Sequence, residues 1–285
     1  MNTTIASITV AAAERGAADK AEDCFRENGV VVVTGALPSE VCDRLGNHLR
    51  QSLAAVDEVL AGYGLSTATP GAGGRIAALL QDPALVQADR RLLQGHFPLS
   101  ARLNQVSWAI PQHLDESRLL HRILGTKSLY AHMPPMFRFV LPGNGGAAVP
   151  AHRDDSYNAH LERFCTVWVP LVDIDSECAG MAVYPGSHLA DDASLALGDA
   201  NPSGWLPPVK TSGFDRVELH PLMPTDIVVM DRTTVHESMA NRSNRTRLSA
   251  DYRFFGEGAR STKHYLDIAR GVLVAPQATA EGMAL

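Results

Sequence analysis

The chain has 285 residues, of which 45% are hydrophobic, so it is long enough to bury a full core in one large domain. Its formal net charge of −6 gives no basic field for phosphates, which argues against a nucleic-acid partner and against a nucleic-acid demethylase. The N-terminal alanine-rich run is interrupted by Glu14 and Arg15, and no apolar run approaches the ~18 residues of a membrane span. We therefore expect a cytoplasmic protein with no membrane partner.

The first half of the chain favours helices. Residues 62–74 contain five glycines and Pro70, which predicts a long loop that is either a mobile lid or a plain excursion of the chain. Around this loop we expect helices at 18–27, 39–56 (capped near Ser39), 74–93 and 115–124, with a β-branched strand at 30–33.

The second half predicts short strands separated by proline and glycine, at 136–141, 164–172, 180–184, 217–219, 226–231 and 247–255. Helices followed by such strands predict a mainly β fold with flanking helices, the double-stranded β-helix or cupin-like jelly roll. We expect one domain over residues 1–285, with a helical part over about 1–135 and a jelly-roll core over about 136–256.

Four cysteines are spread along the chain without a Cys-x-x-Cys pair. This spacing predicts reduced, buried thiols and neither a zinc site nor disulfides. The four are Cys24, Cys42, Cys165 and Cys178.

A His-x-Asp triplet, His152 to Asp154, follows the turn-rich stretch 142–146, and His236 comes 84 residues after the first histidine. If the triplet lies on a strand, its two side chains point the same way, roughly 6–7 Å apart. Two histidines and one carboxylate suit non-haem Fe(II) and leave coordination positions open for oxygen and an organic ligand. Such a triplet also occurs by chance in surface loops, but the ordered motifs that follow favour an iron oxygenase.

Arg247 and Ser249 follow His236 by eleven and thirteen residues. Because they are two residues apart, their side chains point to the same face if this segment is a strand, so both can face the interior of the protein. A buried guanidinium beside a hydroxyl would anchor a carboxylate through two charge-assisted hydrogen bonds. The alternative is that the arginines of this stretch form a solvated basic rim, namely Arg242, Arg245, Arg247 and Arg253.

These motifs resemble the phytanoyl-CoA dioxygenase family of Fe(II)/2-oxoglutarate oxygenases, and the resemblance runs from about residue 25 to residue 255. It is carried by residues 152–154, 168–171, 179–188 and 236–247. The resemblance implies that iron is held by His152, Asp154 and His236. It also implies a 2-oxoglutarate site made by Arg247 with Ser238 and Trp168, next to Ser249.

Two positions qualify the resemblance. Arg153 stands where the family often has glutamine, so its role is left open. Asp154 keeps the carboxylate that related halogenases replace with a small residue, which favours hydroxylation or another oxidation. His188, in the turn 185–188, is expected to fix its loop and not to bind metal.

The implied activity is oxidation of a small molecule by Fe(II), 2-oxoglutarate and O2, with release of succinate and CO2. Asp155, Tyr157 and Asn158 follow the triplet and are candidate substrate contacts at the mouth. The low aromatic content and the acidic charge favour a polar natural product, such as an aminoglycoside modified in antibiotic biosynthesis. The alternatives are hydroxylation of an acyl-CoA or other lipid-like substrate, a non-catalytic cupin module that binds metal and 2-oxoglutarate, and a purely structural β-sandwich. The sequence predicts neither the position of oxidation nor the oligomeric state.

Overall fold

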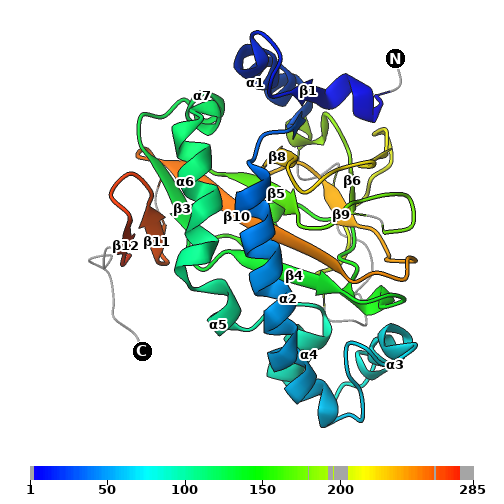
Figure 1. Cartoon of the computed structure of the whole chain (residues 1–285). Coiled ribbons are helices and arrows are strands. Elements are labelled where there is room, and N and C mark those ends of the chain that lie inside the picture. Colours follow the sequence, from blue (N-terminus) through cyan, green and yellow to red (C-terminus); the bar gives the residue numbers. More distant parts are fainter. Residues whose placement is uncertain (1–2, 179, 192–194, 196–204, 260, 277–285) are drawn as a thin grey trace, which may run out of the picture.

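The computed structural model describes residues 3–178, 180–191, 195, 205–259 and 261–276 (Figure 1). The α-helices are α1 (Ala17–Asn28), α2 (Ser39–Ala61), α3 (Ala72–Leu79), α4 (Gln87–Leu93), α5 (Leu99–Arg102), α6 (Ala109–Glu116), α7 (Leu119–Leu124) and α8 (Asp154–Tyr157). The strands are β1 (Thr9–Ala11), β2 (Val30–Thr34), β3 (Leu129–His132), β4 (Met136–Val140), β5 (Cys165–Pro170), β6 (Met181–Val183), β7 (Val217–Glu218), β8 (Ile227–Asp231), β9 (His236–Ser238), β10 (Arg247–Gly256), β11 (Tyr265–Asp267) and β12 (Val272–Val274).

Two sheets form the β core of the described residues. The major sheet has the order β1-β2-β8-β5-β10-β3-β11-β12, and β4 pairs with β10 on the same side as β3. Its strands are antiparallel apart from the parallel pair β1 and β2. The minor sheet has the order β7-β6-β9. Two opposed, mostly antiparallel sheets with helices on the outside make the double-stranded β-helix, which confirms the predicted fold class.

The central strands β2, β5 and β8 are buried on both faces, which explains their nearly continuous apolar sequences. In β2, Val31 and Val33 pack into the core beneath the helices, whereas Val30 and Val32 pack into the core between the sheets. Trp168 of β5 joins this second core together with Met181 and Val183 of the minor sheet. The inner faces of the two sheets therefore meet around Trp168.

Helices cover the outer face of the major sheet. In Figure 1, α2 and α6 cross in front of β5, β10 and β4. The buried residues of α2 recur at helical spacing, as Leu45, Leu49, Val56 and Leu60, and belong to the same core as Ile110 of α6. Because the helices cover the outer face of the major sheet, its inner face, towards the minor sheet, is the one that can hold a functional site.

Several predicted helix boundaries were wrong. The segment 74–93 contains two helices, α3 and α4, because Pro83 between them has no N–H to continue a helix. The segment 115–124 is likewise split, at Arg118, whose φ of 60° is left-handed. The helix predicted to end at residue 56 continues to Ala61, whereas its start was predicted within one residue, because Pro38 is the N-cap and Ser39 the first helical residue.

The loop predicted at 62–74 is shorter than expected, because α3 begins at Ala72. Its first part is tied to α2, since the Thr67 hydroxyl donates to an Asp57 oxygen at 3.0 Å. Five strands were not predicted: β1, β3, β9, β11 and β12.

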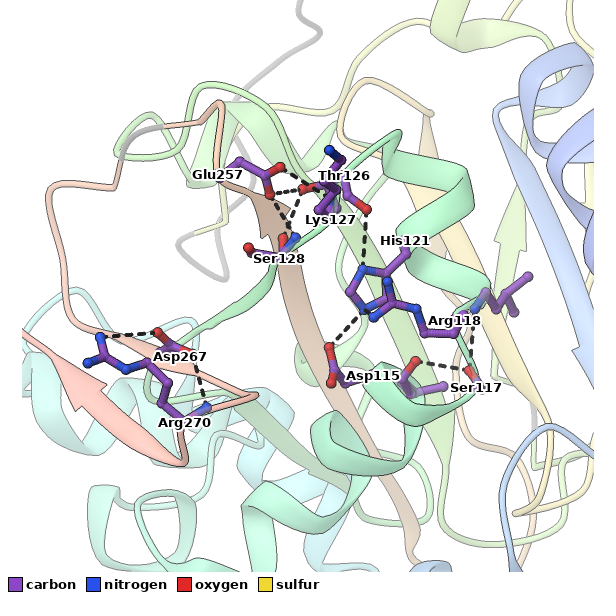
Figure 2. Close-up of polar contacts among 12 residues, drawn as sticks. Asp115, Ser117, Arg118, His121, Thr126, Lys127, Ser128, Glu257, Asp267 and Arg270 are labelled. Atoms are coloured by element: carbon purple, nitrogen blue, oxygen red, sulfur yellow. Dashed lines mark hydrogen bonds and ion pairs between the residues drawn. The ribbon is translucent and has the colours of Figure 1, made fainter.

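The far end of β10 is fastened to the segment that leads into β3 (Figure 2). Glu257 accepts hydrogen bonds from the Thr126 hydroxyl, from the Ser128 amide at 2.8 Å and from the Lys127 amide at 3.2 Å. The Thr126 hydroxyl, followed by these amides, lowers the pKa of Glu257 from 4.5 to about 2.

Among the described helices, none combines the length and apolarity that a membrane span requires.

Candidate metal centre

His152, Asp154 and His236 lie together, with one potential ligand atom of each within 4.8 Å of the others. His236 begins β9, and His152 forms an antiparallel bridge with it. Two backbone hydrogen bonds close this bridge, from the His152 amide to the His236 carbonyl at 2.9 Å and in reverse at 3.0 Å. The backbone therefore fixes the separation of the two imidazoles.

Asp154 reaches the group by a different route from the one predicted. It does not lie on a strand with His152, because Arg153 is extended and Asp154 opens the short helix α8. The Asn158 amide group donates to the Asp154 carbonyl at 2.8 Å, which holds this turn closed. The strand-alternation argument for the triplet was thus wrong.

Both imidazoles present the same nitrogen to the centre. The Nδ1 atoms of His152 and His236 lie 2.8 Å from the Pro150 carbonyl and 3.0 Å from the Thr234 carbonyl. Because a carbonyl only accepts, each Nδ1 carries a proton, which leaves Nε2 of each ring as the nitrogen that can face a metal. Burial, followed by the neighbouring His236, lowers the pKa of His152 to about 3, so this ring is neutral.

The Asp154 carboxylate is held in its ionised form by two neighbours. Its Oδ1 accepts from Arg253 Nη2 at 3.1 Å, and its Oδ2 accepts from the Thr166 hydroxyl. Burial alone would raise the pKa of Asp154, whose residue is 2% exposed, but Arg253 and the two histidines lower it below its usual value.

Two imidazoles and one ionised carboxylate make the donor set that suits Fe(II) in a two-histidine, one-carboxylate site. Backbone carbonyls orient the histidines, and Thr166 and Arg253 orient the acid, as supporting groups do in metal centres. The three residues therefore fit the metal that the sequence predicted for them.

Arg247 is buried, at 2% exposure, on the inner face of β10. Its Nη1 donates to the Gly180 carbonyl at 2.6 Å and to the Met239 carbonyl at 3.3 Å. Burial lowers its pKa to about 10, so the guanidinium stays charged at neutral pH. Ser249 is buried on the same face.

Trp168 packs against the backbone beside this arginine. A Cβ on Gly180 would stand 2.9 Å from the Trp168 ring, so only glycine permits the contact. Ser238, at the end of β9, pairs with Met181 of β6 on the opposing sheet. Arg242 and Arg245 are exposed, so the solvated rim proposed for the four arginines describes these two and not Arg247.

The three candidate substrate contacts lie in different settings, and the Asn158 side chain is the one bonded to the Asp154 carbonyl. The Asp155 carboxylate pairs with Arg153 at 2.9 Å and with Arg232 at 3.3 Å. The Tyr157 ring stands edge-on to the His152 ring at 5.2 Å, and its hydroxyl accepts from the Leu206 amide at 3.0 Å. Of the three, Tyr157 is thus the one whose ring contacts a proposed metal ligand.

His188 lies apart from the three proposed ligands. Its Nε2 is 3.2 Å from the Arg26 carbonyl, and its ring packs over Gly29 at the end of α1.

Two groups that the sequence reasoning missed touch the candidate metal ligands, Thr166 and Arg253. Both lie on the inner face of the major sheet, where their residues pair across β5 and β10. Extending the parity of Arg247 and Ser249 by two further steps would have reached Asp251 and then Arg253.

Comparison with known proteins gives a consistent picture. The sequence pattern described as Phytanoyl-CoA dioxygenase (PhyH) matches residues 25–249. A similar protein is Phytanoyl-CoA dioxygenase domain-containing protein 1 of Bos taurus, which is 23% identical over 256 residues and aligns with 78% of this chain and 84% of its own.

Solved structures share the fold at low identity. The epimerase SnoN from nogalamycin biosynthesis, described as non-heme and alpha-ketoglutarate-dependent, superposes with a TM-score of 0.57 at 18% identity, covering 87% of this chain and 86% of its own. The carbocyclase SnoK from the same biosynthesis gives 0.55 at 19% identity, with 85% of each chain covered. A structure of SnoN was solved with Fe3+, alpha ketoglutarate and nogalamycin RO.

Proposed function

Because this chain belongs to the phytanoyl-CoA dioxygenase family and is an Fe(II)/2-oxoglutarate-dependent oxygenase, we propose that it oxidises a small polar natural-product metabolite, with release of succinate and CO2. The observation that carries the proposal is the convergence of two imidazoles and one ionised carboxylate. In this proposal His152, Asp154 and His236 hold the iron. Bound iron, with O2 and 2-oxoglutarate, supplies the oxidising chemistry.

The protein's own groups place the cosubstrate and the ligands. Arg247 is assigned to the distal carboxylate of 2-oxoglutarate, because it is a buried guanidinium whose planar fork matches a carboxylate. Ser249, Ser238 and Trp168 are assigned to the walls of the same site. Thr166 and Arg253 hold the Asp154 carboxylate in orientation.

The similar solved structures indicate a class of substrate, and the four cysteines indicate a cellular compartment. SnoN and SnoK belong to nogalamycin biosynthesis, which favours a natural-product substrate over an acyl-CoA. Within that class, the acidic composition of the whole chain favours an aminoglycoside. A reducing cytoplasm fits four cysteines that are all free thiols.

The test begins with anaerobic titration of Fe(II) and then 2-oxoglutarate into the purified protein. We expect Asp154→Ala to abolish saturable Fe(II) binding. We expect Arg247→Met to leave Fe(II) binding intact while weakening 2-oxoglutarate binding about 10- to 150-fold, from the loss of about 1.5–3 kcal/mol of charge-assisted bonding. Arg245→Met, at an exposed arginine of the same stretch, is the matched control.

Succinate release then separates an enzyme from a binding module. We expect release that rises on adding the correct metabolite from a panel of natural products. Tight 2-oxoglutarate binding with no succinate from any metabolite would favour the non-catalytic module, and no Fe(II) binding at all would refute the site.

A further inference from the structure

Basic side chains gather beside the carboxylate ligand. We call them the arginine–histidine cluster, because their charges act on one another. They come from α4, α5, β3, β4, β10 and the loops before α5 and β5: Arg91, Arg102, Arg138, Arg253, His96, His132 and His160.

Arg253 connects this cluster to the candidate metal centre. Its Nη2 lies 3.1 Å from Asp154 Oδ1. On β10 it precedes Phe254, which pairs with Ala131, so Arg253 stands beside His132 on the same face of the sheet. The ring centroids of His132 and His160 are 4.5 Å apart. These side chains form a continuous row leading away from the metal ligands.

A second row lies on the β4 side. The Arg138 guanidinium stands 5.0 Å from the Trp205 ring centroid, and the His96 ring lies 5.6 Å from the same indole. Arg102 fixes its Nε to the Pro135 carbonyl at 2.9 Å, just before β4.

The three histidines of the cluster are neutral. Burial, followed by neighbouring arginines that include Arg138 and Arg102, lowers the pKa of His96 well below its usual value. Burial, followed by His160 and Arg253, lowers the pKa of His132 to about 3, and burial with Lys263 and Arg253 lowers that of His160 to about 4. These positive neighbours would also repel a metal cation, so the His132 and His160 pair is not a second metal site.

The arginines outnumber the acids that face them. Arg253 is balanced by Asp154. Arg102 and Arg138 donate to backbone carbonyls and have no ion pair within the described part of the chain. Asp251 supplies one carboxyl on the same face of β10, and burial raises its pKa. Positive charge is left over beside the metal centre.

Four polar atoms of the cluster are buried with no hydrogen-bond partner among the described residues: Arg138 Nε, Arg253 Nε, His132 Nε2 and His160 Nε2. Buried polar atoms in native proteins are nearly always paired. Arg138 is only 7% exposed, so its guanidinium is a built feature of the interior and not a surface charge. Guanidinium N–H groups donate, and a neutral imidazole can donate, so each of these four atoms is a potential donor to an acceptor-rich group.

We propose that the substrate carries an oxyanion, a carboxylate or a phosphate ester, which the arginine–histidine cluster binds beside the iron. The inference rests on the proposed function and narrows it. Guanidinium groups bind carboxylates and phosphates in the same fork geometry, so the cluster serves either. A polyamine such as an aminoglycoside would bring like charges together, which removes the candidate favoured by the acidic composition of the whole chain.

The experiment uses the whole chain, held without O2 and loaded with Fe(II) and 2-oxoglutarate so that Arg247 is already occupied. Acetate, inorganic phosphate and methylammonium are titrated separately by calorimetry. We expect acetate or phosphate to bind saturably, the tighter of the two identifying the substrate group, and methylammonium not to bind.

Arg102→Gln is expected to weaken the anion at least about tenfold, as loss of one charge-assisted bond implies. Arg270→Gln, at a side chain 78% exposed, should change nothing. If Arg102→Gln does not fold, Lys263→Glu at an exposed position gives the same test, because its charge acts on His132 and His160.

Binding of neither anion, equal binding of methylammonium, or an unchanged affinity in these variants would overturn the inference. If 2-oxoglutarate does not bind to the Fe(II)-loaded protein, the proposed function is overturned together with the inference. Cosubstrate binding without anion binding overturns the inference alone.

Discussion

Replacing Thr166 by valine removes a single oxygen from the support of the proposed iron site. Thr166 is 1% exposed, and its hydroxyl donates to Asp154 Oδ2. Valine keeps the shape and the β-branched fit to β5, so the sheet should persist while the carboxylate loses one of its two supports. Arg253 continues to hold Oδ1.

The expected loss follows from the kind of bond removed. A hydrogen bond to a charged group contributes about 1.5–3 kcal/mol, which corresponds to roughly 10- to 150-fold in a binding constant. Supporting groups of metal ligands typically contribute about 10- to 100-fold in metal affinity. With Arg253 still in place, we expect Fe(II) affinity to fall by about tenfold.

Anaerobic titration of Fe(II), followed calorimetrically, measures this change. Ser107→Ala is the control, because Ser107 is also fully buried and its hydroxyl donates to a backbone carbonyl, that of Asn104 at 2.6 Å, and it orients no proposed metal ligand. Both variants should lose thermal stability, but only Thr166→Val should lose iron affinity. An unchanged iron affinity in Thr166→Val, or an equal loss in both variants, would refute the reasoning.

Gly180→Ala places a methyl group 2.9 Å from the Trp168 ring and should cost about 1–3 kcal/mol of stability and weaken 2-oxoglutarate binding, whereas Gly74→Ala, in open space on α3, should stabilise by about 0.5–1 kcal/mol. Denaturant unfolding and cosubstrate titration check both, and a neutral Gly180→Ala would contradict the close packing. Glu257→Gln should flatten the acid dependence of stability. The folded pKa of Glu257 lies below 4.5, at about 2, so its contribution is present above about pH 4.5 and is lost as pH falls towards 2. The difference in melting temperature between the two proteins should be smaller at about pH 3 than at about pH 6, and an equal difference at both pH values would contradict this.

The sequence predicted the strands whose burial leaves a clear pattern. The β-branched runs of β2 and β8 and the alternation of β10 were found within a residue or two. The short strands β3, β11 and β12 were missed because three or four residues carry too little periodicity. Their strand character comes from pairing, of β3 with distant β10, of β11 with β3, and of β12 with β11.

The proposed metal ligands were predicted from their spacing, although the reason given for that spacing was wrong. His152 and His236 meet through a bridge between segments 84 residues apart, which periodicity does not report. Arg253 looked like one more member of an arginine-rich surface stretch, and only its position on a strand folded inward places it against Asp154. The excess of positive charge beside the proposed metal site could not be predicted either, because the chain as a whole is acidic.

The three proposed ligands are held by two different kinds of backbone structure. His152 and His236 are positioned by a β-bridge, whereas Asp154 is positioned by the first turn of α8. Exchanging the acid for a smaller side chain would therefore leave the imidazole pair standing, with a place open for an external anion. The architecture in this way lets one ligand be altered, by evolution or by an experimenter, without dismantling the scaffold that presents the other two.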